Sequence, residues 1–192
     1  MGSNMNQASD NELMTLAQKG SDGAFDLLFE RYRSGIFSFL CRMLAPDMRA
    51  AEELLQEVFV KAFRGKDLYE PRAKFSMWLY TIARNHFLNY VKSRRYAQAM
   101  RTESLDARME RTEIEDRRPM AQAVERNERM TALESAIAGL PGKYREVFLL
   151  RAVDGLPHED IARILDSSPA AVRVNYHRAR MMLREQLEPV LR

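Results

Sequence analysis

The sequence predicts an all-α protein of two small helical domains joined by a charged linker, the C-terminal domain containing a helix-turn-helix. Glycine and proline are scarce, at 8 and 7 of 192 residues, whereas residues that favour helices are abundant. Apolar residues recur at intervals of three and four, and no segment alternates apolar and polar residues as a strand would. This apolar pattern stops in one long charged segment and resumes after it, which indicates two domains.

The first apolar pattern covers residues 10–96. Apolar positions with helical spacing are separated by glycine, proline and capping residues, which end or begin helices. We therefore expect four helices: from Asp10, as its cap, to Gly20; from Ser21 or Asp22 to the residue before Pro46; a third that ends at Gly65; and a fourth from Phe75 to about Tyr96. Residues 66–74 are expected to form a loop.

Residues 97–129 have a different composition. They contain seven Arg and eight Asp or Glu, and no aromatic residue occurs between Tyr96 and Tyr144. A segment of this kind can bury little apolar surface. We expect a solvated linker that is helical in part at most.

The second apolar pattern covers residues 130–192. A helix that begins near Met130 is broken at Pro141-Gly142, and the helix that follows is ended by the turn at Asp154-Gly155. A short helix then runs from Pro157 to Leu165. After the turn Asp166-Ser167, Ser168 is a good N-cap and Pro169 a good first residue for the last helix. This order predicts a helix-turn-helix.

The last helix has two faces. Its inner face is predicted to contain Val172, Tyr176, Ala179, Leu183 and Leu187, and its outer face Ala170, Arg173, His177, Arg180 and Arg184, with Arg178 beside them. A basic outer face on the second helix of such a motif suits the major groove of DNA. Arg173 could form a bidentate contact to guanine, and the later arginines are expected to hold phosphates. The alternative is an ordinary amphipathic helix with a solvated basic face.

The start of the fourth helix is basic and aromatic. From Pro71 to Thr102 there are seven Lys or Arg and no acid, and such surfaces bind single-stranded or unstacked bases. Core spacing competes with this interpretation for the aromatic residues, and Trp78 is expected to pack rather than stack. Arg84 and Asn85 fall on the polar side and are the better candidates for nucleic-acid contacts.

The third helix has acids on the side away from its apolar stripe. Glu53, Gln56, Glu57 and Lys61 lie there. This side is either a solvated face or a docking surface for a basic partner, and spacing alone leaves both interpretations open.

Several classes of protein are disfavoured by composition and motifs. The glycines form no phosphate loop, the three histidines lie far apart, and Cys41 is the single cysteine. We therefore expect neither an enzyme nor a metal or other cofactor. No apolar run approaches the length of a membrane span, so we expect a cytoplasmic protein without direct membrane insertion. The net charge of +3 is distributed in patches, which indicates more than one partner.

Three segments in this order resemble bacterial extracytoplasmic-function (ECF) sigma factors of RNA polymerase. They are AEELLQEVFVKAFR at 51–64, FSMWLYTIARN at 75–85, and LPGKYREVFLL at 140–150 leading into VRVNYHRAR at 172–180. The resemblance implies sigma domain two at 10–96, a linker at 97–129 and sigma domain four at 130–192. It also implies binding to core RNA polymerase and promoter DNA, and control by an anti-sigma factor, often anchored in the membrane.

The resemblance also implies roles for individual residues. Polymerase would contact Glu53, Gln56, Glu57 and Lys61. The minus-ten element would be read and opened by Lys74, Phe75, Trp78, Arg84, Asn85 and Lys92. The minus-thirty-five element would contact Ser168, Ala170, Ala171, Arg173, Val174, His177, Arg178 and Arg180.

Some positions depart from the family pattern. Asn89 stands where Asp is frequent, and Asp166 where glycine is usual in the turn. Aspartate tolerates a left-handed backbone better than most residues, so we expect the turn to be retained. Ala171, Val174 and Asn175 replace the commoner Thr, Ser and Arg, which affects the preferred promoter and not the fold.

Three other functions compete with this interpretation of the sequence. An enzyme has no motif to support it. A stand-alone helix-turn-helix regulator would bind duplex DNA without polymerase, whereas a sigma factor would bind it weakly until polymerase is present. A helical adaptor without nucleic acid would leave both acid-free basic segments unexplained.

Overall fold

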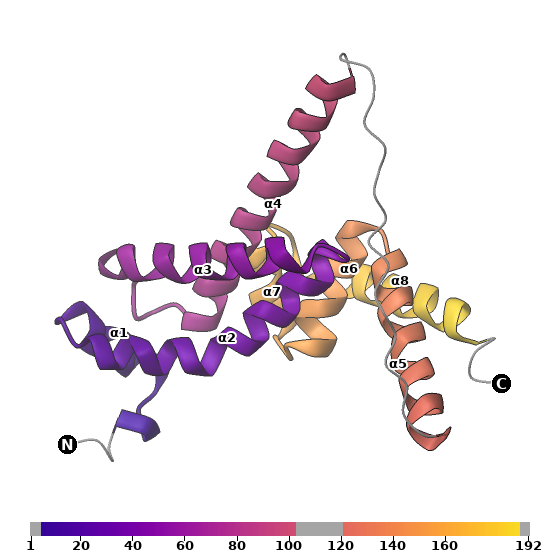
Figure 1. Ribbon diagram of the computed structural model, residues 1–192. Helices are drawn as coiled ribbons and strands as arrows, with labels where there is room; N and C mark the ends of the chain where they lie inside the picture. Colours follow the sequence, from indigo (N-terminus) through magenta and orange to yellow (C-terminus); the bar gives the residue numbers. More distant parts are fainter. Residues whose placement is uncertain (1–4, 103–120, 189–192) are drawn as a thin grey trace.

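The computed structural model describes residues 5–102 and 121–188, and these residues form helices and connecting turns without a strand. Figure 1 shows the helices in chain order. The N-terminal half contains η1 (Met5–Gln7), α1 (Asp10–Gln18), α2 (Asp22–Leu44), α3 (Met48–Arg64), η2 (Lys66–Leu68) and α4 (Phe75–Thr102). The C-terminal half contains α5 (Ala121–Gly139), α6 (Gly142–Phe148), the π-helical turn η3 (Leu149–Val153), α7 (His158–Ile164) and α8 (Pro169–Leu187). The all-α prediction is confirmed.

The N-cap of helix α1 lies one residue earlier than expected. Ser9 is the N-cap, and its hydroxyl accepts from the Glu12 amide while the Glu12 carboxylate accepts from the Ser9 amide. This reciprocal capping box satisfies two backbone donors. Asp10, predicted to be the cap, is instead the first helical residue, and it binds Arg31 and Tyr32 of α2 at 2.8 and 2.5 Å.

The core of the N-terminal half lies between α2, α3 and α4. Helix α3 has the clean apolar stripe that its sequence predicts, with Ala51, Leu54, Val58 and Ala62 all buried. Two edge-to-face aromatic pairs fix α2 on α3: Phe25 with Phe63 at 5.2 Å, and Phe29 with Phe59 at 4.7 Å between ring centroids. Such aromatic pairs contribute more to stability than the apolar area they bury would give.

The helices on either side of the expected linker are longer than predicted. Helix α4 continues from Tyr96 to Thr102, and α5 already begins at Ala121 instead of near Met130. In Figure 1 the far end of α4 projects beyond the rest of the molecule. The ends of the predicted linker, residues 97–102 and 121–129, are therefore helical, and its centre lies outside the described residues.

The helix-turn-helix of the C-terminal half is formed by α7 and α8. Asp166 in the turn has φ +49°, which is the left-handed conformation expected where glycine is usual. The Ser168 hydroxyl accepts from the Ala171 amide at 3.1 Å, and Pro169 is the first residue of α8. The predicted turn, cap and first helical residue are all confirmed.

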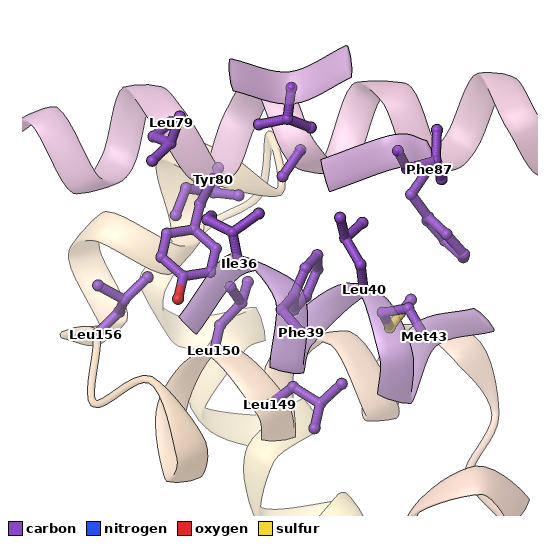
Figure 2. Close-up of a cluster of buried hydrophobic side chains, with 14 of the residues drawn as sticks. Ile36, Phe39, Leu40, Met43, Leu79, Tyr80, Phe87, Leu149, Leu150 and Leu156 are labelled. Carbon is purple, nitrogen blue, oxygen red and sulfur yellow. The ribbon is translucent and has the colours of Figure 1, made fainter. Parts of the chain in front are cut away.

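The two halves of the chain share one buried apolar cluster. Figure 2 shows its side chains, which come from α2 (Ile36, Phe39, Leu40, Met43), α4 (Leu79, Tyr80, Phe87) and the C-terminal half (Leu149, Leu150, Leu156). The two halves therefore pack on each other, because α2 and α4 each present a second apolar side that is covered by η3 and α7.

Candidate nucleic-acid and polymerase interfaces

The side of α3 opposite its buried stripe is exposed. We call Glu53, Gln56, Glu57 and Lys61 the α3 polar face, and all four side chains are exposed. Glu53 accepts from Arg49 one turn earlier at 3.0 Å, in a solvated pair that contributes little to stability. The face is therefore available to a partner.

A histidine of α4 adjoins this face. His86 Nδ1 lies 3.2 Å from Glu57 Oε2, and the His86 side chain is 22% exposed. Together with Glu53, Leu54 and Asn89 it lines a shallow groove between α3 and α4. The sequence did not identify His86, because the pairing depends on two helices coming together and no local motif encodes that contact.

The aromatic residues at the start of α4 divide between core and surface. Phe75, predicted to contact the minus-ten element, is only 1% exposed and packs edge-to-face on Tyr32 and Tyr69 at 5.2 and 6.0 Å. It cannot reach DNA in this structure, because the helix begins by inserting its first aromatic ring into the core. Trp78 is half-buried and lies 5.3 Å from Tyr69, in agreement with the packing expected for it.

The basic candidates of this region have two different environments. Asn85 and Lys92 are exposed on α4. Lys74 and Arg84 instead pair with carboxylates of the C-terminal half: Lys74 Nζ lies 2.7 Å from Asp160 Oδ2, and Arg84 Nε lies 2.8 Å from Glu146 Oε1. Arg84 was expected on the solvated polar side, but only 21% of its side chain is exposed.

These acids depend on their cationic partners. Burial raises the pKa of Glu146 above its usual range, and the adjacent Arg84 opposes that rise. Only 10% of the Glu146 side chain and 7% of the Asp160 side chain are exposed. A buried carboxylate that loses its cation is strongly disfavoured, so the loss of either cation would be costly while the two halves stay packed.

The outer face of α8 is basic and solvated. We call Ala170, Arg173, His177, Arg180 and Arg184 the α8 basic face, and all five are exposed. Val172, Ala179 and Leu183 are buried on the opposite side, as predicted. Tyr176 and Leu187 are only partly buried; Tyr176 stacks on Phe148 at a centroid distance of 6.2 Å.

The remaining α8 candidates lie around this face. Ser168, Val174 and Arg178 are exposed, and Ala171 is half-buried. Arg178 Nη1 lies 3.5 Å from the Tyr144 hydroxyl of α6, and this interaction lowers the pKa of Tyr144 below its usual value. The α6–α8 contact thereby orients Arg178 beside the basic face.

The described residues offer no metal site and no spanning helix. Within residues 5–102 and 121–188, no group of three or more His, Cys, Asp or Glu side chains is placed to hold a metal ion. Over the same residues, every helix is too short or too polar to cross a membrane.

The sigma-70 region 2 family matches residues 28–96, and the sigma-70 region 4 family matches residues 130–183. The RNA polymerase sigma-H factor of Pseudomonas aeruginosa is 30% identical over 195 residues, covering 98% of both chains. The ECF RNA polymerase sigma-E factor of Escherichia coli K12 is 31% identical over 193 residues, covering 97% of this chain and 98% of the relative. The chain belongs to the ECF sigma factors.

Solved structures of sigma factors share the fold. CnrH in complex with the cytosolic domain of CnrY superposes with a TM-score of 0.68 at 23% identity, covering 95% of this chain and 99% of that one. The sigma factor RpoE of Bartonella quintana, in complex with the anti-sigma factor NepR, also gives 0.68, at 21% identity over 85% and 96% of the two chains. These two structures therefore have the same fold as this sigma factor.

As a sigma factor, the protein binds core RNA polymerase and directs it to promoters. Sigma factors are transcription initiation factors rather than enzymes. The region 2 match contains the α3 polar face and the exposed Asn85 and Lys92 of α4, and the region 4 match contains the α8 basic face except Arg184.

Asp154 gives the sigma factor a pH dependence that can be measured. Burial raises the pKa of Asp154 from 3.8 to about 6, while Tyr80 and Arg42 of region 2 oppose the rise. The Tyr80 hydroxyl reaches Asp154 over Gly35, where an added Cβ would lie 3.0 Å from that hydroxyl. Between these pKa values the folded protein holds a proton that the unfolded chain has released.

The contribution of Asp154 to the free energy of unfolding should therefore fall as the pH rises from 4 through 6, by at most about 3 kcal/mol. Asp154→Asn should remove this part of the dependence and stabilise the protein at pH 8. Glu146 contributes in the same direction, so the difference between the wild-type and variant urea-unfolding profiles isolates Asp154. Parallel profiles from pH 5 to 8 would show that Asp154 keeps its ordinary pKa.

Proposed function

We propose that this ECF sigma factor docks on core RNA polymerase through the α3 polar face, reads the minus-ten element with α4, and reads the minus-thirty-five element with the α8 basic face. The observation that carries the proposal is the α8 basic face, whose five side chains are exposed while the opposite side of the helix is buried. Basic side chains without acids on one side of a helix suit the major groove.

The proposal assigns α4 to the opened minus-ten element. Asn85 and Lys92 are exposed there, and Lys74 and Arg84 add positive charge once their carboxylate partners leave. Trp78 is half-buried and offers only part of its ring for stacking on a base. Phe75 supports this surface from beneath.

We also propose that an anti-sigma factor controls the protein. The Bartonella RpoE, which shares its fold, is bound to the anti-sigma factor NepR. Such a partner would act in the cytoplasm, where polymerase is available, and could itself be anchored in a membrane.

Reconstitution tests the proposed function. Purified protein is added to core RNA polymerase with a library of promoter fragments, and transcripts are sequenced. We expect transcripts from a defined set of promoters with shared minus-ten and minus-thirty-five elements. Tight binding of the protein alone to duplex DNA, with no polymerase-dependent transcripts, would favour a stand-alone regulator instead.

Arg173→Ala should weaken holoenzyme binding to the selected promoters by about 1–3 kcal/mol, because a bidentate contact to one base is lost. The measurement is competition between the selected promoter and a copy altered in its minus-thirty-five element. Arg180→Ala is the matched control, since a phosphate contact supports all sequences alike. If Arg173→Ala weakened both DNAs equally, Arg173 would be a phosphate contact only.

A further inference from the structure

Within the part of the chain that the structure describes, ion pairs join region 2 to region 4. Lys74 and Arg84 pair with Asp160 and Glu146, as described above, and Arg42 of α2 pairs with Glu134 of α5 at 2.8 Å. The first two involve residues proposed to contact the minus-ten element, whereas Arg42 lies on a different helix. A cation whose charge is already neutralised by a carboxylate is a weaker partner for a DNA phosphate, so the two kinds of anion compete for Lys74 and Arg84.

Loss of these ion pairs would be more costly for the two buried carboxylates than for the exposed Lys74. The side chains of Asp160 and Glu146 are 7% and 10% exposed, against 65% for Lys74. If the cations turned away while the domains stayed together, the carboxylates would remain buried without a counter-charge, which is costly. Release of the cations therefore requires the domains to separate, which gives the acids back to water.

The shared apolar cluster keeps regions 2 and 4 in contact, in what we call the closed state. Figure 2 shows Phe39 of α2 and Tyr80 of α4 among Leu149, Leu150 and Leu156 of region 4, and the Phe39 and Tyr80 rings meet at 5.7 Å. Burial of apolar surface favours contact between the two domains but does not depend on direction. The ion pairs fix how the domains are positioned relative to each other. Helix α4 packs on α7 in this state, so Lys74 and Arg84 face region 4, whereas Lys92 is exposed.

We infer that Glu146 and Asp160 form a carboxylate latch that occupies the minus-ten cations in the free protein, so that promoter single strand and region 4 compete for Lys74 and Arg84. This inference rests on the proposed minus-ten role of α4. Opening of the latch, by polymerase or by substitution, exposes the basic side of α4.

The test uses the full chain with near-isosteric changes, Glu146→Gln and Asp160→Asn. Dyes on Glu30→Cys and Glu185→Cys, two exposed positions in a Cys41→Ser background, report the distance between domains by energy transfer. We expect the double variant to populate a longer distance than wild type without polymerase. Its affinity for the non-template single strand of a selected promoter should rise by about tenfold, as the competent fraction grows.

Glu134→Gln is the matched control. It removes one carboxylate from the same domain interface but leaves Lys74 and Arg84 paired. Its gain in single-strand affinity should be less than about twofold. An equal gain for Glu134→Gln would overturn the latch, because general loosening would then account for the effect. An unchanged distance in the double variant would overturn it as well, and circular dichroism confirms that each variant is folded.

A further pair of holoenzyme measurements separates this inference from the proposed function. Lys74→Ala with Arg84→Ala should lower promoter opening, whereas Glu146→Gln with Asp160→Asn should leave it near the wild-type rate. Full promoter opening by the first pair would refute the minus-ten role itself. If that pair is defective and the latch variant shows no gain in single-strand affinity, the function stands and the latch is refuted.

Discussion

Replacing Phe75 by alanine should destabilise the N-terminal domain by about 3–5 kcal/mol, because a fully buried aromatic side chain leaves a cavity when it is removed. Phe75 is 1% exposed, and its ring contacts Tyr32, Tyr69 and Trp78. Urea unfolding followed by circular dichroism measures the effect. This variant should lose promoter binding only because it unfolds. Its promoter binding should therefore return at lower temperatures at which the domain is folded.

Leu88 provides the matched control for this change. It lies on the same helix but is 41% exposed, so Leu88→Ala should change the free energy of unfolding by less than about 0.5 kcal/mol. If Phe75→Ala kept wild-type stability and still lost minus-ten binding, Phe75 would be a DNA contact after all, and the packing seen at the start of α4 would not hold in solution.

Reversing both Glu53 and Glu57 to lysine should weaken binding to core polymerase by on the order of 3 kcal/mol, because like charges then face each other across the interface. The side chains of these two acids are 61% and 60% exposed, so the domain should stay folded. Fluorescence anisotropy of labelled protein with core polymerase measures the affinity.

Two other exposed acids serve as the control for net charge. Glu30→Lys with Glu185→Lys makes the same change in charge away from the α3 polar face. That variant should bind polymerase within about twofold of wild type at physiological salt, where distant charges are screened. Equal losses in the two variants would mean that overall charge, and not the α3 polar face, governs docking.

Locally encoded features could be predicted from the sequence. The cap at Ser168, the left-handed turn at Asp166 and the division of α8 into buried and basic sides are all present as expected. Each of these depends on residues within a few positions of one another, since capping, turn conformation and helical spacing are short-range effects. The exposure of the α3 polar face follows from the same spacing. The cap predicted at Asp10 is wrong by one residue. Ser9 is the N-cap because it has a glutamate, Glu12, three residues later and forms a capping box with it.

Contacts between distant segments were decided by the tertiary structure alone. The sequence marks Phe75, Lys74 and Arg84 as an acid-free aromatic and basic stretch. Their partners Tyr32, Asp160 and Glu146 come from distant segments of the chain. Helical spacing predicts which side of α4 is polar. It does not predict which other segment covers that side. The physical reason is that burial of α2 and α4 against η3 and α7 sums many weak non-directional contacts, and the charges on each side then pair as that packing places them.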